Sequence, residues 1–430
     1  MELSSKLEKR TAVCSVIGLG YVGLPLAVEF AKAGLQTIGI DISEEKVDRV
    51  NSGESYIGDV DSKELGEAVE KGFLKATCDF DVLKDVDTIN ICVPTPLRKT
   101  RDPDISYIVA AVGEIKKTLH KGQLIVLEST TYPGTTDEVI MPILEETGLK
   151  VGSDFFLAFS PERVDPGNEV YTTKNIPKVV GGVTAACTEL ATALYRAAHM
   201  NPVPVNSSRV AETVKLLENT FRSVNIGLVN EIALMCNKMG INVWEVIDAA
   251  ATKPFGFMPF YPGPGLGGHC IPIDPFYLSW KAKMSGFEAR FIELAGMING
   301  DMPMYVVNRI SEVLNERRKC INGSSFLIMG VSYKEGIDDT RESPAYDIIR
   351  LLQQRGAEVR YYDPYVGDLE EMAGVGSCEY RADEIGKLDC AIIVTGHKGI
   401  DYQLLVDNCS LVFDTRNVLK GVQGDNIVRL

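Results

Sequence analysis

The sequence predicts an α/β protein in which two doubly wound parallel-sheet domains are joined by a long central helix. Three observations lead to this prediction. Apolar, strand-like runs alternate with helix-like runs over about residues 11–205, and the same order returns over about 320–430. Between them, apolar residues recur every three or four positions over one long stretch. Alternating strands and helices are typical of parallel sheets, and the three-to-four spacing is typical of an amphipathic helix.

The first segment contains six strand-like runs separated by amphipathic stretches. Two of these stretches, residues 24–34 and 105–119, have the spacing of helices. The N-terminus begins with charged residues and runs directly into the first strand, without the apolar stretch of a signal peptide. The expected strands are residues 12–20, 36–42, 88–96, 123–130, 155–162 and 177–182.

The central helix is expected to begin near Asn206, Ser207 and Ser208, which are good capping residues, and to end at Gly240. At 1.5 Å per residue it would be roughly 45–50 Å long, more than one small domain buries. We therefore predict that it joins two domains and that one of its faces serves in dimerisation. Its apolar positions are Val210, Val214, Leu217, Phe221, Val224, Leu228, Ile232 and Met235.

The last segment repeats features of the first. Residues 325–333 have the pattern of a strand, residues 342–356 that of a helix, and residues 357–365 that of a second strand. In both segments a glycine ends the helix and an aspartate follows the next strand. We interpret this segment as a second, degenerate copy of the first unit.

The composition narrows the classes of function. The chain has 59 acidic and 44 basic residues and a net charge of -15, which argues against a general nucleic-acid or anionic-membrane binder. The sequence contains no apolar run long enough for a transmembrane helix, so we expect a cytoplasmic protein. Its ten cysteines form no C-x-x-C pair and suggest no metal site. Nine of them are expected to be buried, small apolar residues.

Residues 18–23 form a G-x-G-x-x-G motif that follows an apolar strand and opens a helix. Asp41 ends the next strand, where a carboxylate accepts ribose hydroxyls and repels a 2′-phosphate. This is the fingerprint of a Rossmann-like dinucleotide site, and it favours NAD over NADP. The alternative is a glycine-rich turn without a ligand. The expected cofactor contacts here are Gly18, Gly20, Tyr21, Val22, Gly23 and Asp41.

Two threonines follow other predicted strands. Thr95 lies in Val-Pro-Thr-Pro and Thr130 in Glu-Ser-Thr. Ligands of open α/β sheets bind beyond the carboxyl ends of the strands, so both are candidate contacts on the nicotinamide side. The alternative is that they satisfy the backbone of their own turns.

The most unusual stretch is residues 261–275, in which four glycines and two prolines lead to Cys270. Such a run cannot form a helix, and it leaves few side chains to block approach to the thiol. Asp274 lies four residues further on. His269 is excluded as a base because adjacent side chains of an extended segment point to opposite sides. The alternative for Cys270 is a buried structural cysteine.

Lys215 and Asn219 are four residues apart on the predicted long helix and therefore share a face, with Arg222 one turn further. A lysine and an amide on one face can hold an alkoxide or oxyanion. Periodicity alone favours the alternative, a solvated polar edge of the helix.

Taken together, these motifs resemble the UDP-glucose/GDP-mannose dehydrogenase family along nearly the whole chain. Several long motifs in one order are far more specific than any one of them. The matching pieces are residues 16–27, 93–96, 128–136, 159–167, 214–222, 263–275 and 330–344.

The resemblance implies an NAD-binding domain over 1–205, a central helical dimerisation domain with the cysteine loop over 206–310, and a UDP-sugar domain over 311–430. It implies that Cys270 is the nucleophile and that Lys215 and Asn219 stabilise the oxyanion. Asp274 would orient or activate water and support Lys215. Thr130 and Glu162 would position water. The implied substrate contacts are Glu162, Arg163, Lys215, Asn219, Gly267 and Lys334, and the further cofactor contacts are Thr95, Thr130 and Arg341.

The implied reaction is a two-step oxidation of the C6 hydroxyl of a UDP-sugar to a carboxylate, with two NAD. The thiol would hold the aldehyde as a thiohemiacetal, which a second oxidation converts to a thioester. The Gly-Gly-His-Cys loop resembles the branch that oxidises UDP-N-acetylhexosamines, and UDP-N-acetylglucosamine most of all, with UDP-N-acetylmannosamine as the alternative. The acid would serve surface polysaccharide synthesis.

Two other functions compete with this reading. A single-step hydroxyacid dehydrogenase also joins a Rossmann domain to a helix with Lys and Asn four apart, but it does not explain the cysteine loop. A non-catalytic nucleotide-sugar-binding protein is the second. The expected partners are a UDP-sugar and a second copy of the chain, with no metal, nucleic acid or membrane.

Overall fold

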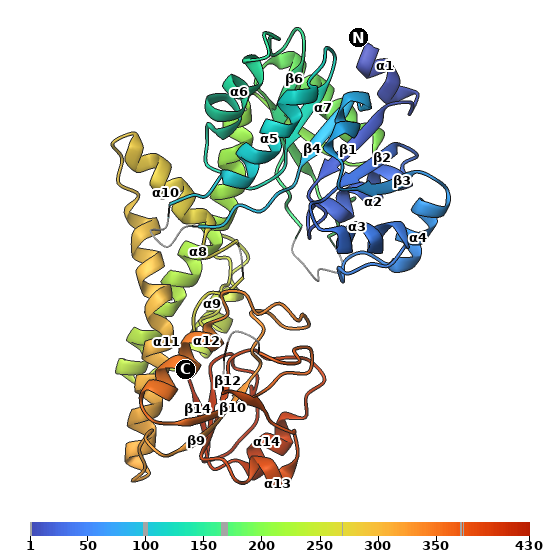
Figure 1. Cartoon of the computed structure of the whole chain (residues 1–430). Coiled ribbons are helices and arrows are strands. Elements are labelled where there is room, and N and C mark those ends of the chain that lie inside the picture. The colour runs from blue at the N-terminus through green and yellow to red at the C-terminus, as the bar shows by residue number, and fades with distance from the viewer. Residues whose placement is uncertain (1, 98–101, 165–170, 269, 370–371, 373) are drawn as a thin grey trace. The chain divides into compact units, whose positions relative to one another are not determined.

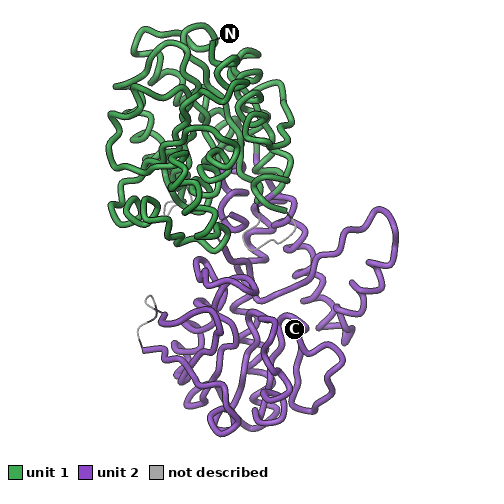
Figure 2. The backbone as a smooth tube through the Cα atoms, turned by 90° about the vertical axis from the view of Figure 1, so that its right-hand side faces the viewer, with its two compact units in different colours: residues 1–218, 280–287 green, residues 219–279, 288–430 purple. Residues whose placement is uncertain are grey.

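The computed structural model describes residues 2–97, 102–164, 171–268, 270–369, 372 and 374–430. They form two compact units (Figure 2). Unit 1 comprises residues 1–218 and 280–287, and unit 2 comprises residues 219–279 and 288–430. The boundary falls inside helix α8 (Ser208–Met239). The predicted class is confirmed, because each unit contains a sheet of the expected type and the long helix runs through both.

The sheet of unit 1 has eight strands in the order β3-β2-β1-β4-β5-β6-β7-β8. Neighbouring strands are parallel except for β6 and β7, which are antiparallel. The order reverses between β1 and β4, which is where open α/β sheets bind ligands. The strands are β1 (Val13–Ile17), β2 (Gln36–Ile40), β3 (Leu74–Thr77), β4 (Thr88–Ile91), β5 (Leu124–Leu127), β6 (Phe156–Phe159), β7 (Lys178–Gly182) and β8 (Pro202–Val205).

Helices cover both faces of this sheet, and their apolar residues form one core on each face. The central strands β4 and β5 are buried at every position, as expected for strands between two layers of helices. The helices are α1 (Glu2–Glu8), α2 (Gly23–Lys32), α3 (Glu44–Asn51), α4 (Ser62–Glu70), α5 (Ser106–Thr118), α6 (Met141–Glu145) and α7 (Ala185–Ala197), with short helical turns at Phe80–Asp85 and Thr135–Ile140.

The prediction that the N-terminus runs directly into a strand was wrong, because helix α1 precedes β1. Leu3 and Leu7 are four residues apart and both are buried in the same core as α2 and α7. Lys6 also forms an ion pair of 2.7 Å with Asp87. A short helix of this kind is stabilised by tertiary packing, which local periodicity over seven residues does not reveal.

Helix α8 has 32 residues, which corresponds to about 48 Å, and Gly240 follows it with φ +69°. In unit 2 it lies beside α11 (Arg290–Glu316), as Figure 1 shows. The two helices approach closely at Gly227, where a Cβ would lie 3.1 Å from Ala295. The amide of Asn230 donates to Asn299 at 2.9 Å between them. Shorter helices α9 (Val243–Ala251) and α10 (Asp274–Met284) separate α8 from α11 in the chain.

The sheet of unit 2 has six parallel strands in the order β11-β10-β9-β12-β13-β14. The order β11-β10-β9-β12 repeats the order β3-β2-β1-β4 of unit 1, which confirms a second Rossmann-like unit. Its strands are β9 (Ser325–Met329), β10 (Glu358–Tyr362), β11 (Gly376–Ser377), β12 (Cys390–Ile393), β13 (Val412–Asp414) and β14 (Ile427–Arg429), and its helices are α12 (Pro344–Gln354), α13 (Ala382–Ile385) and α14 (Tyr402–Asn408).

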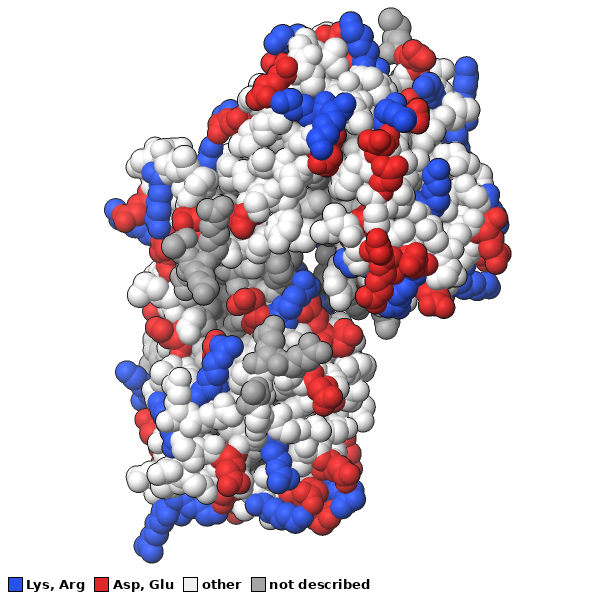
Figure 3. Space-filling model, viewed as in Figure 1, with Lys and Arg blue, Asp and Glu red and all other residues white. Residues whose placement is uncertain are grey.

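The surface is mixed in charge. On the face shown in Figure 3, Lys and Arg side chains are scattered among Asp and Glu side chains on both units. Within the described residues, none of the helices has both the length and the hydropathy needed to cross a membrane.

Candidate functional site

The glycine motif of unit 1 forms a cradle between β1 and α2. Gly18 has φ +90°, and a Cβ there would lie 2.5 Å from the carbonyl oxygen of Cys92. A Cβ at Gly23 would lie 1.8 Å from the carbonyl oxygen of Gly18. In contrast, nothing lies within 4 Å of the Cβ position of Gly20. The first and third glycines are therefore required by the protein itself, while Gly20 keeps space open above the start of α2. Half-exposed Tyr21 and Val22, which precedes α2, complete this loop.

Asp41 lies at the end of β2 beside this cradle. One carboxylate oxygen accepts the N–H of Leu19 at 2.8 Å and the other accepts the N–H of Ser43 at 3.0 Å. Lys46 lies 3.7 Å from the carboxylate. A carboxylate has about four acceptor positions, so Asp41 keeps capacity for further donors such as ribose hydroxyls. The open position above Gly20 and this free capacity both fit a dinucleotide.

The two candidate threonines lie at neighbouring strand ends. Thr95 is buried after β4, and Thr130 is half-buried after β5. The hydroxyl of Ser129 donates to the carbonyl of Val93 at 2.7 Å and joins the two loops. Both threonines thus lie at the carboxyl edge of the sheet, next to the point where the strand order reverses.

The same edge contains a buried ion cluster. The ammonium of Lys178 lies 2.7 Å from Glu128 and 3.3 Å from Glu162, and the side chains of Lys178 and Glu128 are 3% and 0% exposed. Glu128 follows β5, and Glu162 follows β6. Lys178 is the first residue of β7, and because β7 is antiparallel to β6 its first residue reaches this edge. Lys178 was not predicted as a site residue, because the contact depends on this reversal of strand direction.

The far oxygen of Glu128 is also occupied. It accepts the side-chain amide of Asn90 at 3.0 Å and a short hydrogen bond from the hydroxyl of Tyr195. The ammonium of Lys178 lies 5.3 Å from the centre of the Tyr195 ring. Burial raises the pKa of Glu128, and Lys178 opposes this shift without reversing it.

Glu162 is held from several directions. One of its oxygens accepts the N–H groups of Arg163 at 2.8 Å and Val164 at 2.9 Å, and the other faces Lys178. Burial acts to raise the pKa of Glu162, but Lys178, the two N–H groups and Lys215 together hold it below its usual value. The structure therefore brings Glu162 and Lys215 into electrostatic contact within unit 1.

The side chain of Arg163 is already bound to other residues of unit 1. Its guanidinium forms an ion pair of 2.5 Å with Glu218 and donates to the carbonyl of Pro177 at 2.6 Å. Any role as a substrate contact therefore requires Arg163 to share or exchange these partners.

In unit 2 the structure brings Asn219, Cys270 and Asp274 together. The amide of Asn219 donates to the carboxylate of Asp274 at 2.5 Å, and Asp274 is buried. The N–H of Asp274 donates to the carbonyl of Cys270 at 2.8 Å, so a turn of three residues joins the cysteine to the start of α10. Cys270 is exposed and forms no disulfide bond, as the glycine-rich loop predicted. His269 lies outside the described residues.

The expectation that the other nine cysteines are buried was wrong for Cys78 and Cys320, which are exposed. Cys78 follows β3, an edge strand of the first sheet, and Cys320 lies in the connection between α11 and β9. Both positions lie in connections outside the helices and strands, and the sequence pattern does not specify which connections are covered.

The cysteine loop packs on the loop after β9. A Cβ at Gly267 would lie 2.6 Å from the Cβ of Tyr333, and the N–H of Gly268 donates to the carbonyl of Arg341 at 3.1 Å. The guanidinium of Arg341 is paired with Asp339 at 2.7 Å and is half-exposed. The loop 332–344 therefore connects the cysteine loop to Lys334 and Arg341, two other predicted site residues.

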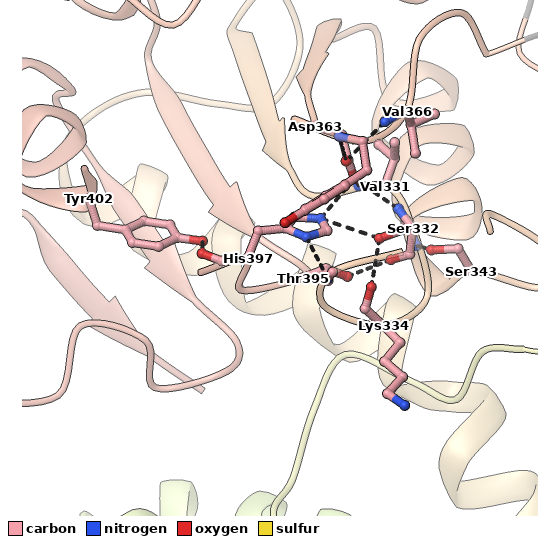
Figure 4. Close-up of polar contacts among 12 residues, drawn as sticks. Val331, Ser332, Lys334, Ser343, Asp363, Val366, Thr395, His397 and Tyr402 are labelled. Carbon is pink, nitrogen blue, oxygen red and sulfur yellow. Dashed lines mark hydrogen bonds and ion pairs between the residues drawn. The ribbon is translucent and has the colours of Figure 1, made fainter. Parts of the chain in front are cut away.

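A buried polar cluster around His397 and Asp363 stabilises the loop 332–344 (Figure 4). The Nδ1 of His397 accepts the N–H of Gly336 at 3.2 Å, which leaves the hydrogen on Nε2. Nε2 lies 3.0 Å from the carboxylate of Asp363 and 3.3 Å from the hydroxyl of Ser332. That hydroxyl donates to the carbonyl of Lys334 at 2.8 Å. The side chain of Lys334 points away from the cluster.

Asp363 occupies the place in unit 2 that Asp41 occupies in unit 1, at the end of the second strand of the repeat. Its carboxylate accepts four backbone N–H groups in addition to His397. Burial opposes ionisation, but these hydrogen bonds hold the pKa of Asp363 below its usual value. The carboxylate has no acceptor position left for a ribose. The four donors are the N–H groups of Val331, Ser332, Tyr365 and Val366.

Arg416 is a further cation that the sequence analysis missed. It follows β13 at the carboxyl edge of the second sheet, and its Nε donates to the carbonyl of Val394 at 2.8 Å. Burial lowers its pKa to about 10, although Asp414 opposes the shift. A Cβ at Gly263 would lie 2.5 Å from its Nη1, so the guanidinium lies against the start of the cysteine loop. Among the described residues, no group of three or more His, Cys, Asp or Glu side chains is arranged to hold a metal.

Comparisons with known proteins agree with this arrangement. Models of the UDP-glucose/GDP-mannose dehydrogenase family match residues 12–199 (NAD binding domain), 209–301 (central domain) and 327–421 (UDP binding domain). The chain is 38% identical to a UDP-N-acetyl-D-glucosamine 6-dehydrogenase of Pseudomonas aeruginosa, over 89% of this chain and 90% of that protein. It is 35% identical to a UDP-N-acetyl-D-mannosamine dehydrogenase of Pyrococcus horikoshii, over 94% and 96%.

Solved structures give the same result. The UDP-D-ManNAc dehydrogenase from Pyrococcus horikoshii superposes with a TM-score of 0.89 at 34% identity, over 97% of this chain and 98% of that one. An NDP-N-acetyl-D-galactosaminuronic acid dehydrogenase from Methanosarcina mazei Go1 gives a TM-score of 0.84 at 30% identity, over 100% and 97%.

Proposed function

Because the chain belongs to the UDP-glucose/GDP-mannose dehydrogenase family, we propose that it oxidises the C6 hydroxyl of a UDP-N-acetylhexosamine to a carboxylate in two steps. The enzyme is an NAD-dependent oxidoreductase that acts on a UDP-sugar. UDP-N-acetylglucosamine is the proposed substrate, and UDP-N-acetylmannosamine is the alternative, since relatives of both kinds share about a third of their residues with the chain. The acid would serve surface polysaccharide synthesis.

The observation that carries the two-step proposal is the exposed thiol of Cys270 beside the Asn219–Asp274 pair. NAD supplies the hydride acceptor for each oxidation. The first oxidation converts the alcohol to an aldehyde, and the thiol adds to its carbonyl carbon. The resulting thiohemiacetal still carries a hydrogen on C6, so a second oxidation gives a thioester, and water releases the acid and the free thiol. Overall, one alcohol, one water and two NAD give one carboxylate, two NADH and three protons.

The neighbours of the thiol have complementary roles in this proposal. Asp274 accepts one amide hydrogen of Asn219, which fixes the amide and leaves its other hydrogen to donate to an oxyanion. Lys215 would supply positive charge to the same oxyanion. Thr130 and the ionised Glu162 would position the hydrolytic water.

In this proposal each of the two sheets carries one nucleotide-binding site. We assign NAD to residues 1–205, with Gly20 and Asp41 as the central contacts and Thr95 and Arg341 as further ones. The UDP-sugar is assigned to the segment 311–430, with Lys334 and Gly267 as contacts. Arg416 joins this set, because a buried guanidinium at the carboxyl edge of the sheet is suited to a diphosphate or a uracil.

A homodimer is also part of the proposal, formed through the central segment 206–310. In unit 2, helices α8 and α11 expose large apolar side chains along their lengths, which is unusual for a surface in contact with water. These side chains are Phe221, Leu228, Met235 and Met239 of α8 and Phe291, Leu294 and Met297 of α11.

The test is to count NADH formed per substrate consumed, across a panel of UDP-sugars. Two NADH per UDP-N-acetylglucosamine, and the highest kcat/KM for that sugar, are expected. One NADH per substrate would instead support a single-step dehydrogenase, and no NADH with any sugar would support a non-catalytic binding protein. Cys270→Ser should lose full turnover, and unchanged turnover would remove the thioester mechanism.

A further inference from the structure

Lys178 has no part in the proposed chemistry, yet it contacts a residue that does. Its ammonium lies between two carboxylates at the ligand edge of the first sheet, 2.7 Å from Glu128 and 3.3 Å from Glu162. It also donates to the carbonyl of Pro161 at 3.5 Å. These contacts come from the ends of β5 and β6 and the start of β7. Burying the ammonium of Lys178 at this edge of the sheet costs desolvation energy. Packing alone therefore does not explain a lysine at this position.

The two carboxylates differ in what they offer to a ligand. Glu128 is completely buried, and its remaining oxygen is used by Asn90 and Tyr195. Glu162 is 13% exposed, so one part of its carboxylate remains accessible. Glu128 is therefore suited to hold Lys178 in place, and Glu162 is suited to contact a ligand or water outside the ion cluster.

We propose that Lys178 is a positioning residue that holds the Glu162 carboxylate in one orientation, and in its charged form, for hydrolysis of the thioester. The proposal rests on the proposed function, in which Glu162 positions water for that step. Two backbone N–H groups fix one oxygen of Glu162, and Lys178 fixes the direction of the other. With Lys178 anchored by Glu128, both oxygens of the Glu162 carboxylate are therefore held by contacts.

The groups that face Glu162 decide its charge. Lys178 on β7 and Lys215 on α8 favour the carboxylate, together with the N–H groups of Arg163 and Val164. Burial and the negative charge of Glu128, which follows β5, oppose it. Cys92, after β4, and Tyr195, on α7, complete the surroundings, and burial raises the pKa of both, so they stay neutral. Lys178 is the closest cation, and its loss should raise the pKa of Glu162.

The key variant is the pair Lys178→Met with Glu128→Gln. Removing Lys178 alone would leave two buried carboxylates without compensation, and that variant is expected to fold poorly. The second change removes one negative charge and keeps a side chain that can bond to Asn90 and Tyr195. Glu162 then loses its closest cation in a cluster whose net charge is unchanged, while Lys215 remains. Lys178→Arg, which keeps the charge, is the matched control.

Three measurements test the proposal. Hydride transfer from the alcohol should keep its wild-type rate in the double variant. The thioester on Cys270 should accumulate, as seen by mass spectrometry of enzyme quenched during turnover. The acidic limb of the kcat–pH profile should move up, by less than the about 1–3 pH units that an ammonium at this distance contributes, because Glu128→Gln also removes a repulsive negative charge. Lys178→Arg should behave like the wild type in all three.

A wild-type pH profile and no thioester accumulation in the folded double variant would overturn the proposal, since a merely structural pair predicts that result. If the double variant does not fold, Lys178→Gln with Glu128→Gln replaces it, with the same expected shift. A wild-type enzyme that forms one NADH and no Cys270 adduct would instead refute the proposed function. The two failures are therefore distinguishable.

Discussion

His397→Phe tests whether the buried cluster of unit 2 holds the loop that carries Lys334. Phenylalanine keeps the ring and its packing against Tyr365, whose centre lies 5.1 Å away. It removes the hydrogen bond to the carboxylate of Asp363 at 3.0 Å and the acceptor for the N–H of Gly336 at 3.2 Å. The change therefore removes polar contacts at nearly constant volume.

The magnitude follows from these two contacts. A hydrogen bond to a charged group contributes about 1.5–3 kcal/mol and a neutral one about 0.5–1.5 kcal/mol. Asp363 keeps its four backbone donors and stays paired, so the expected loss is about 2–4 kcal/mol in the free energy of unfolding of unit 2. For a unit of this size that corresponds to a fall of roughly 4–16 °C in Tm. The loop should also bind less well, raising KM for the UDP-sugar while KM for NAD stays near the wild-type value.

Thermal unfolding by circular dichroism and steady-state kinetics give both quantities. Tyr402→Phe is the matched control, because it removes one neutral hydrogen bond to the carbonyl of His397 and should cost about 1 kcal/mol. His397→Asn, which keeps an acceptor for Gly336, should fall between the two. A His397→Phe enzyme with an unchanged Tm and an unchanged KM for the UDP-sugar would refute the reasoning.

Four further predictions concern the cofactor cradle and the exposed helices. Gly20→Ala should fold normally but raise KM for NAD by on the order of tenfold or more, because its Cβ has free space only until the pyrophosphate arrives; normal cofactor binding would contradict this. Gly23→Ala should lose more than about 3 kcal/mol of stability, measured by urea unfolding, because its Cβ would overlap the carbonyl of Gly18. Asp41→Asn should reduce the preference for NAD over NADP by about tenfold, since the repulsion of a 2′-phosphate is lost, and a wild-type enzyme that prefers NADP would overturn the assignment. Leu228→Glu should shift the sedimentation coefficient from dimer to monomer, and a monomeric wild type would refute the proposed dimer.

The sequence was sufficient for features that depend on local patterns. The alternation of strand-like and helix-like runs predicted a parallel sheet in each unit, and the spacing between Asn206 and Gly240 predicted α8 almost to its ends. The cradle was predicted by the glycine spacing, because Gly18 and Gly23 are required by contacts with the neighbouring strand and with each other, while Gly20 leaves space open. The exposed thiol of Cys270 followed from its glycine-rich loop.

The missed features depend on pairing between distant parts of the chain. Lys178 meets Glu128 only because β7 runs antiparallel to β6, and nothing in the strand's own residues specifies its direction. His397 meets Asp363 because β10 and β12 lie on opposite sides of β9. Arg416 lies beside Gly263, more than a hundred residues earlier in the chain. Such contacts depend on the order and direction of the strands in the sheet. The hydrophobic pattern and the composition of the sequence constrain these only weakly.

The difference between Asp41 and Asp363 has a consequence for how the two halves of the chain diverged. Both carboxylates end the second strand of the same architecture, but one retains unused lone pairs and the other has none. Restoring a glycine motif after β9 would therefore not create a second dinucleotide receptor while His397 and the surrounding N–H groups fill Asp363. In duplicated Rossmann-like units, the number of unused acceptor positions on this carboxylate should distinguish units that bind a dinucleotide from units in which the carboxylate only stabilises its own loop. It should do so better than the number of glycines.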